Sequence, residues 1–370
     1  MIQDVYIIGA TGNVGRTLVR QIYEKDDINP VSHPNPTRVV GLASSTHTVY
    51  SPSGLSRQDS DSFINRKSES ATKYSSLFDL LDFARIGNRD ESSNLVFIDV
   101  TSLDTPMMEF HLHVIEKTPY GIVTANKNPI ALYDYEIFQR LTHDTRRYGY
   151  RCSVMAGAAA IPILQDIRDL GDKVITIEGC FSGTLGYITT GLEQGIAFSE
   201  RVRDAFKKGY TEPHPRDDLS GLDVRRKLIV LGRTAGFSVN LNDIPQKPFI
   251  PADYLTEPNP EMFMAKTPGL DRWFSEMMSD AKAKKQTLRY ATRLDATMQS
   301  PLMRVALMEV PKESILGTLE GTLNALIVTT DAPPEEQEEP LRRPGAGLGI
   351  TARNIRKDLM NLLPQRRNKI

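Results

Sequence analysis

The sequence has few residues of the kind that form covalent crosslinks or metal centres. It carries two cysteines, Cys152 and Cys180, and six histidines in 370 residues. No Cys-x-x-Cys or His-x-x-x-His spacing occurs among them, which argues against a disulfide framework and against a structural zinc site. We therefore expect reduced thiols and no zinc.

Long apolar runs and an excess of one charge are also missing. The 45 basic and 46 acidic residues leave a formal net charge of -1. No apolar run approaches the roughly 18 residues of a membrane span, and the first residues lack the basic region of a signal peptide. This composition argues against nucleic acid or membrane as a partner, and we expect a cytoplasmic protein of about two domains.

The first 150 residues alternate between short apolar runs and amphipathic segments. A Rossmann-type, doubly wound α/β domain is expected, because continuous apolar strands alternating with helices are typical of a parallel sheet covered on both faces. The serine-rich segment 44–76 lacks periodicity and is predicted to be a surface loop. Strands are predicted at 5–9, 38–43, 94–100 and 120–125, and helices at 13–23, 76–87 and 106–118.

The pattern changes after about residue 150. Helical segments at 163–171, 199–209 and 224–236 are followed by alternating, strand-like segments at 287–295, 303–310 and 323–330. This order predicts a second, α+β domain. The expected division is a nucleotide-binding domain at 1–150, a second domain at 151–330 and a C-terminal segment at 331–370, which begins with an exposed acidic linker and ends in a helix.

A glycine-rich turn, GATGNVG, follows the first predicted strand and opens the first helix. Glycines permit a tight turn and close approach to a pyrophosphate, and the helix N-terminus offers free N–H groups to it. The GxxGxxG spacing is less specific than GxGxxG, so a purely structural turn is the alternative. Cofactor contacts are expected from the turn residues Gly9, Thr11, Gly12, Asn13, Val14 and Gly15.

The residues that end the other strands refine the cofactor prediction. An NAD site usually places an acid after the second strand, but Ser44 and Ser45 stand there. Their hydroxyls leave room for a 2′-phosphate, so we expect NADP, with NAD tolerated. Thr101, Ser102 and Lys127 end later strands and should face the same crevice, although a solvated loop lysine is the alternative for Lys127.

The stretch GYTEPHPRDDLSGLDVRRK, residues 209–227, concentrates charge before an apolar run. Asp223 and Lys227 are spaced i,i+4 and share one face of a predicted helix, with Ser220 as its expected N-cap. A surface salt bridge is the ordinary interpretation of such a pair. It is weakened here because acids beside a lysine can bind a substrate ammonium group and hold a proton donor; the nearby acids are Glu212, Asp217 and Asp218.

This stretch resembles the signature of homoserine dehydrogenase nearly residue for residue. The segments VTANK, SVMAGAAAIP, FSGTLGYI and PGAGLGITA are also similar to that family, so the resemblance covers almost the whole chain. It is closest to the dehydrogenase half of the bifunctional aspartokinase/homoserine dehydrogenases, without the kinase half. The resemblance implies reversible NAD(P)H-dependent reduction of L-aspartate 4-semialdehyde to L-homoserine, in threonine and methionine biosynthesis, by a homodimer paired through its second domain.

The resemblance also implies roles for individual residues. Lys227 and Lys127 would be catalytic near the reacting oxygen, and Asp223 would orient the lysine. Gly345 and Gly347 would return the chain to the nucleotide-binding domain beside the cofactor. Substrate contacts would come from Glu212, Asp218, Gly183, Thr184 and Tyr210.

Departures from the family pattern concern single positions. His214 replaces an acid, and Asn128 stands where a second lysine is common. Arg151 stands near the place where relatives use an acid to help hold a monovalent cation. A cation held only by the carbonyls of Val154, Ala156 and Ala158 is therefore expected to bind weakly.

Two other functions remain open at this point. An acylating semialdehyde dehydrogenase would use Cys152 or Cys180 as its nucleophile, but both cysteines lie in apolar runs typical of a core. Phosphate-dependent reduction of NADP by the semialdehyde would favour that enzyme. A catalytically silent NADP sensor is the second alternative, and turnover of homoserine would exclude it.

Overall fold

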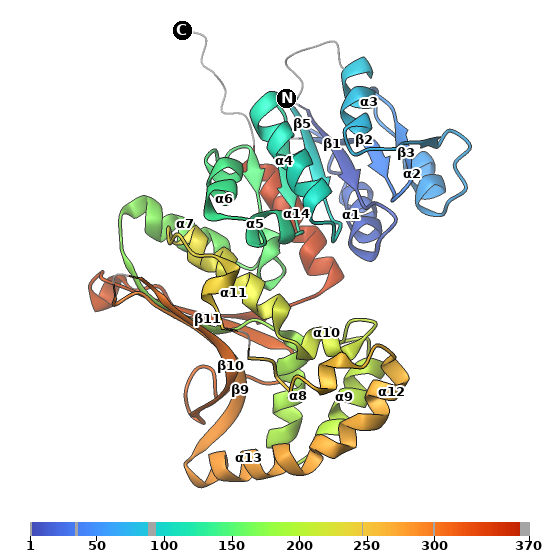
Figure 1. Ribbon diagram of the computed structural model, residues 1–370. Coiled ribbons are helices and arrows are strands. Elements are labelled where there is room, and N and C mark those ends of the chain that lie inside the picture. Colours follow the sequence, from blue (N-terminus) through green and yellow to red (C-terminus); the bar gives the residue numbers. More distant parts are fainter. Residues whose placement is uncertain (1, 34–35, 88–93, 246, 299, 363–370) are drawn as a thin grey trace. The chain divides into compact units, whose positions relative to one another are not determined.

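The computed structural model describes residues 2–33, 36–87, 94–245, 247–298 and 300–362 (Figure 1). The chain divides into two compact units. The first is built from residues 1–157 together with 347–370, and the second from residues 158–346. The second unit is thus inserted, in sequence, between the two parts of the first.

A mainly parallel sheet forms the centre of the first unit. Its strand order over the described residues is β4-β3-β2-β1-β5-β6-β7. Strand β3 pairs antiparallel with both β2 and β4, and the other pairs are parallel. Every residue of β1 is buried, as its central position requires. The strands are β1 (Gln3–Ile8), β2 (Thr37–Ala43), β3 (His47–Tyr50), β4 (Thr72–Lys73), β5 (Asn94–Asp99), β6 (Gly121–Thr124) and β7 (Tyr148–Gly149).

Helices follow the strands in the order that the sequence predicts. The C-terminal helix α14 packs against α1 and adds Ile355 and Leu359 to the core of this unit. The predicted doubly wound parallel fold is confirmed. The helices are α1 (Asn13–Glu24), α2 (Arg57–Ile64), α3 (Asp79–Gly87), α4 (Thr105–Lys117), α5 (Asn128–Ala131), α6 (Tyr135–Thr142) and α14 (Leu348–Asn361), with 3-10 turns at Arg151–Ser153 and Met155–Gly157.

The prediction of an irregular loop at 44–76 is wrong. This segment forms β3, α2 and β4. Ser56 and Asp59 close a capping box at the start of α2, each side chain accepting a hydrogen bond from the other's backbone N–H. Phe63 and Ile64 bury the end of the helix, so a short capped helix suffices despite the weak periodicity.

An antiparallel sheet with the strand order β10-β9-β8-β11-β12 forms the base of the second unit. The predicted α+β character is confirmed. Segment 331–345 is only partly a linker, because β12 pairs with β11. The strands are β8 (Val174–Cys180), β9 (Gln286–Asp295), β10 (Leu302–Pro311), β11 (Leu323–Thr330) and β12 (Leu341–Pro344).

The helices of the second unit carry the stretch that the sequence singles out. They are α7 (Ala160–Leu170), α8 (Gly183–Glu193), α9 (Phe198–Lys207), α10 (Pro215–Leu219), α11 (Leu222–Thr234), α12 (Pro260–Lys266) and α13 (Asp271–Ala283) (Figure 1). Short 3-10 turns occupy Leu241–Asp243, Tyr254–Thr256, Thr267–Leu270 and Pro334–Glu336. In the described parts of the chain, every helix is too short or too polar to cross a membrane.

Candidate active site

The glycine turn joins β1 to α1 in the first unit. The N–H groups of Gly9 and Ala10 both donate to the Ala43 carbonyl oxygen of β2, at 2.9 Å. Gly9 has a φ of +89°, which favours glycine, and a Cβ on Gly15 would lie 2.7 Å from Ala10 Cα. Helix α1 starts after Gly12 without a side-chain cap. Its first N–H groups are thus available to a phosphate.

A pocket of about 410 Å³ opens beside this turn. It brings together Thr11, Ser44 and Ser45, which the sequence predicts as cofactor contacts, and adds Arg66, which the sequence interpretation missed. A cation beside hydroxyl groups is suited to a phosphate. The complete lining is Thr11, Ser44, Ser45, Thr46, His47, Phe63, Arg66, Ser68 and Ala71.

Arg66 occupies an unusual backbone position at the end of α2. Its φ is +59°, and its N–H donates to the Phe63 carbonyl oxygen at 2.9 Å. A side chain in this left-handed region costs roughly 1–2 kcal/mol, so glycine would be the ordinary choice for a helix end. Arg16 fastens the same helix end to the glycine turn, because its guanidinium donates to the carbonyl oxygens of Thr11 and Ile64, each at 2.8 Å.

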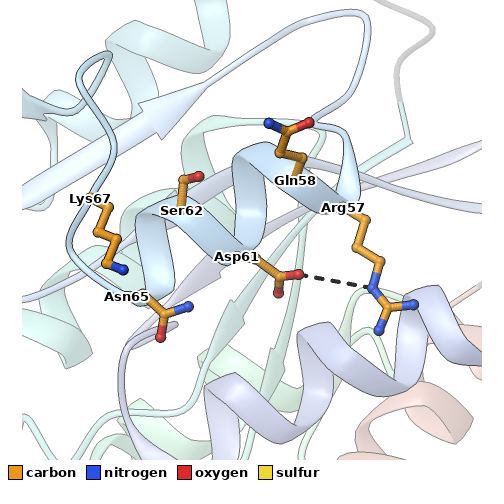
Figure 2. A pocket seen from close by; sticks show the side chains of 6 residues that line it. All are labelled: Arg57, Gln58, Asp61, Ser62, Asn65 and Lys67. Atoms are coloured by element: carbon orange, nitrogen blue, oxygen red, sulfur yellow. Dashed lines mark ion pairs between the residues drawn. The ribbon is translucent and has the colours of Figure 1, made fainter.

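A second depression, of about 450 Å³, lies along α2 (Figure 2). Arg57 and Asp61 form an ion pair across one helical turn at 3.9 Å, and both side chains are about 60% exposed. Such an exposed, mixed-charge surface does not select an anion. It is lined by Arg57, Gln58, Asp61, Ser62, Asn65 and Lys67, so Lys67 belongs to a different surface from its neighbour Arg66.

The loops that follow β5 and β6 lie beside the glycine turn. The Thr101 methyl group is 3.1 Å from the position that a Cβ on Gly9 would occupy. The Asn128 side-chain amide donates to the Ser102 carbonyl oxygen at 2.9 Å and so ties the two loops together. Lys127, half-buried, directly precedes α5 in the second of these loops. The asparagine that replaces a second lysine thus holds the loop of Lys127.

The opening residues of α11 form the charged centre of the second unit. The Lys227 ammonium group contacts the Asp223 carboxylate at 2.7 Å and donates to the Phe181 carbonyl oxygen at 2.7 Å. The Lys227 side chain is 13% exposed, whereas the Asp223 side chain is 47% exposed. A lysine held by two acceptors at fixed positions is a preorganised donor rather than a mobile surface charge.

The other predicted substrate residues lie next to one another in the same unit. The Asp218 carboxylate accepts a hydrogen bond from the Glu212 backbone N–H at 2.8 Å, and Thr184 donates to the Tyr210 carbonyl oxygen at 2.5 Å. Burial raises the pKa of Asp218 to about 6, against the lowering effect of its hydrogen bonds. Gly183 opens α8 one residue before Thr184. The stretch is thus folded into a cluster of acids.

Local structure corrects one detail of this stretch and adds a short helix. The prediction of Ser220 as N-cap is wrong by one residue: Gly221 caps α11 with a φ of +72°, and a Cβ there would collide with the Tyr290 hydroxyl. A short helix, α10, also precedes α11. His214 caps α10, because its Nδ1 accepts from the Arg216 N–H at 3.2 Å. The histidine thus performs a capping role open to an acid.

Arg151 is buried in the first unit and pairs with Asp358 of α14. Its Nε lies 3.1 Å from Asp358 Oδ1, and its backbone N–H donates to Oδ2 at 2.9 Å. Burial raises the pKa of Asp358 to about 6, although Arg151 opposes that shift.

The three carbonyl oxygens predicted to hold a cation each accept a hydrogen bond. The Val154 carbonyl oxygen accepts from Gly157 N–H at 3.1 Å. In the same way, Ala156 accepts from the Asn354 amide at 2.9 Å, and Ala158 from Ala160 N–H at 2.8 Å.

Three further residues that the sequence predicts as cofactor contacts lie at the start of a helix or in the turn between β12 and α14. Val14, in the first turn of α1, is partly buried against the core of the first unit. Gly345 follows β12, where a Cβ would collide with the buried Asn324 side chain, and Gly347 precedes α14 with a φ of +149°.

Both cysteines are free and buried. Burial raises the pKa of Cys152 well above its ordinary value and that of Cys180 to about 12. Since the thiolate is the nucleophile, neither thiol is activated. The acylating dehydrogenase is disfavoured by these surroundings.

A Rossmann-type unit with a glycine turn, joined in sequence to a unit with a lysine among carboxylates, defines a protein of the dinucleotide-dependent dehydrogenase class. The family model described as homoserine dehydrogenase matches residues 162–360. The chain belongs to the homoserine dehydrogenase family.

Named relatives agree with this assignment. The chain is 33% identical to a chloroplastic bifunctional aspartokinase/homoserine dehydrogenase 2 from Zea mays, over 97% of this chain and 38% of the relative. It is 29% identical to the homoserine dehydrogenase of Schizosaccharomyces pombe, over 98% of this chain and 96% of the relative. The chain thus spans about two-fifths of the length of the bifunctional relative.

A solved structure supports the fold. A hyperthermophilic archaeal homoserine dehydrogenase in complex with NADPH is similar with a TM-score of 0.71 and 19% identity, over 98% of each chain.

Proposed function

We propose that the chain catalyses the reversible NADPH-dependent reduction of L-aspartate 4-semialdehyde to L-homoserine. The observation that carries this proposal is the Lys227 ammonium group, held at 2.7 Å from both the Asp223 carboxylate and the Phe181 carbonyl oxygen. Reduction of an aldehyde builds negative charge on its oxygen, which a fixed cationic donor stabilises and protonates. Family membership supports the choice of substrate.

Proton transfer falls to Lys227 in this proposal. An ammonium group has three N–H donors, and the contacts of Lys227 with Asp223 and Phe181 use two of them. The third can donate to the developing alkoxide. The nicotinamide ring supplies the hydride when NADPH is bound. Lys127, at the end of β6, is proposed as a second cation near the reacting oxygen.

Substrate binding is proposed to depend on the acids of the same unit. The substrate carries an α-ammonium group, and the carboxylates of Glu212 and Asp218 can attract it. Gly183, Thr184 and Tyr210 would line the remainder of the site. The hydrogen bond between Glu212 N–H and the Asp218 carboxylate keeps these two residues next to each other.

NADP is proposed as the preferred cofactor, with NAD accepted less well. The pocket with Ser44, Ser45 and Arg66 contains hydroxyl groups and a guanidinium but no acid among its lining residues, which suits a 2′-phosphate. The archaeal relative was solved in complex with NADPH, which supports the same preference. The backbone of the glycine turn would hold the pyrophosphate, and Thr101, Ser102, Gly345 and Gly347 would complete the contacts.

Assembly and surroundings complete the proposal. A homodimer is proposed through the sheet of the second unit, where β10 is an edge strand and Leu302 on it is 66% exposed. Light scattering at micromolar concentration tests it, and a monomer would contradict it. Cytoplasmic location is also proposed. A monovalent cation at the carbonyls of Val154, Ala156 and Ala158 is proposed to bind weakly, because Arg151 stands near the place where an acid would help to hold it.

One assay tests the central proposal. Purified protein is mixed with homoserine and either NADP or NAD, and formation of the reduced cofactor is followed by absorbance. Saturable, homoserine-dependent reduction with NADP preferred is expected. Binding of NADPH without turnover would instead identify a sensor. Phosphate-dependent reduction of NADP by the semialdehyde would identify the acylating enzyme.

A further inference from the structure

Asp99, at the end of β5, is a completely buried acid with a full set of partners. Its Oδ1 accepts hydrogen bonds from the Thr101 N–H at 2.9 Å and from the Thr101 hydroxyl at 2.8 Å. Its Oδ2 lies 3.2 Å from the Thr124 hydroxyl. A buried carboxylate without compensation would be costly, so these hydrogen bonds are needed to hold it in the core.

His111, on α4, lies beside this carboxylate. It is also completely buried, and its Nε2 lies 3.4 Å from Asp99 Oδ2. The other ring nitrogen, Nδ1, lies 2.9 Å from the Tyr148 hydroxyl of β7. Burial alone would raise the pKa of Asp99, but His111 and Thr101 hold that pKa below its usual value. The carboxylate is therefore charged inside the core.

Thr124 extends this buried pair to the loop that carries Lys127. Its hydroxyl oxygen accepts from the Asn126 N–H at 2.9 Å. Its single proton has three acceptors within reach: the Asn126 carbonyl oxygen at 3.1 Å, Asp99 Oδ2 at 3.2 Å and the Asp99 carbonyl oxygen at 3.4 Å. Two of these three acceptors belong to Asp99, and only the carboxylate among them is charged. The buried Asn126 side chain then donates to the Leu103 carbonyl oxygen at 2.7 Å and accepts from the Asn128 N–H at 3.0 Å. Lys127 lies between these two asparagines, so both of its neighbours are fixed.

We infer that Asp99 and His111 are positioning residues, which hold the backbone of the Lys127 loop in its reactive position through the Thr124 hydroxyl. The inference rests on the proposed function, because it assigns the pair to the geometry of a catalytic lysine. Neither Asp99 nor His111 touches the reacting atoms. Displacement of a reacting group by about 1 Å can cost about 10²-fold in rate, so this anchor acts on kcat rather than on cofactor affinity.

Thr124→Val tests the anchor, because valine keeps the shape of threonine and removes only the hydroxyl. We expect kcat for homoserine oxidation to fall by about tenfold or more, and the Kd for NADPH, measured by fluorescence, to stay within about twofold. Thr124→Ser restores the hydroxyl and should restore kcat to within about threefold. Thr142→Val is the matched control, since Thr142 is also buried and its hydroxyl donates to the Phe138 carbonyl oxygen of its own helix at 2.8 Å.

A double-mutant cycle separates positioning from general destabilisation. If Thr124 acts through the lysine, Thr124→Val should change kcat by less than about twofold in a Lys127→Ala background. Equal losses in both backgrounds, or an unchanged kcat in Thr124→Val, would overturn the inference. If the valine variant does not fold, the effect of His111→Gln on kcat is compared in the wild-type and Lys127→Ala backgrounds instead. Failure of the proposed function is distinct, because wild-type protein would then show no homoserine-dependent turnover.

Discussion

The Lys227 ammonium group contacts the Asp223 carboxylate one turn earlier on α11, at 2.7 Å. Pairs at this spacing on exposed helices contribute only about 0.3–0.5 kcal/mol to stability. This one differs because the lysine is mostly buried and also reaches the Phe181 carbonyl oxygen, which precedes α8. These two contacts therefore hold the Lys227 ammonium group in place as a hydrogen-bond donor, and its removal should have a measurable effect on catalysis.

Removal of the Lys227 amine should reduce catalysis without loss of cofactor binding. We expect Lys227→Ala to lower kcat by about 10²-fold or more, because the alkoxide loses its proton donor. Asp223→Asn should also be damaging, but non-additively with Lys227→Ala, since groups that act as one unit lose most of their effect at the first removal. Steady-state kinetics and NADPH fluorescence titration provide the measurements.

The matched control for this change is Lys284→Ala. Lys284 also pairs with an acid, Glu309, at 2.8 Å, but its side chain is 57% exposed. Its loss should leave kcat unchanged. If Lys227→Ala instead keeps kcat within about threefold of wild type and only raises KM, Lys227 is a binding residue and Lys127 inherits proton transfer.

Arg66→Gly should weaken NADPH binding while the protein becomes no less stable. Loss of one charge-assisted contact to a 2′-phosphate is expected to raise the Kd for NADPH by about tenfold, with that for NADH unchanged. Glycine adopts the φ of +59° without the cost that arginine carries, so Tm should stay the same or rise. Fluorescence titration and thermal melts measure the two effects.

Lys67→Ala is the control for Arg66, because it removes a neighbouring positive charge that faces the other depression (Figure 2). Its Kd for NADPH should match wild type. Ser44→Asp should shift selectivity toward NAD, since an acid there favours a ribose hydroxyl over a phosphate. A wild-type preference for NADH by about tenfold or more would show that the pocket does not hold a 2′-phosphate.

The regular elements and the charged face of α11 can be predicted from the sequence, because both depend on local periodicity. Asp223 and Lys227 share a face on any helix, so their contact is predictable from spacing. Helix α2 could not be predicted from residue spacing, because its short apolar face is surrounded by serines and its stability depends on capping at Ser56. Strand β12 could not be predicted either. It lies in an acidic, proline-bearing segment, and it forms only through its tertiary pairing with β11.

The role of Arg66 could not be predicted from its neighbours in sequence. Its position depends on a left-handed backbone at the end of α2 and on Arg16, 50 residues away in sequence, which binds that helix end to the glycine turn. The link from His111 through Asp99 to Thr124 is equally non-local, because three different elements meet only after the sheet has formed.

Arg151→Met should destabilise the first unit by about 3–5 kcal/mol at neutral pH, because it leaves the Asp358 carboxylate buried without its partner. The folded-state pKa of Asp358 is already raised to about 6 by burial. A raised pKa favours the protonated form in the folded state, so the stability it contributes is present below about pH 4 and is lost as pH rises through about 6.

Thermal melts at pH 5 and pH 7.5 therefore check the sign. The difference in Tm between wild type and Arg151→Met should widen as pH rises, since more of the unpaired acid must ionise. Arg272→Met, which removes one member of an exposed pair with Glu276, should show no such trend. A Tm difference that is equal or smaller at pH 7.5 would contradict the buried ion pair.

The decrease of kcat/KM for homoserine at acidic pH should follow the protonation of Asp218. Burial raises the pKa of this carboxyl to about 6, so it loses its charge as pH falls below that value and no longer attracts the substrate ammonium group. In the free enzyme, kcat/KM for homoserine should therefore fall by about tenfold per pH unit below about pH 6. Asp218→Asn should lower kcat/KM at pH 7.5 and abolish this decrease at acidic pH.

Asp217→Asn is the control, because it changes the exposed neighbouring acid, and this variant should keep the decrease in kcat/KM at acidic pH. A flat wild-type profile between pH 5 and pH 7, or an unchanged decrease in Asp218→Asn, would remove Asp218 from substrate binding and leave Glu212 as the acid that holds the amine.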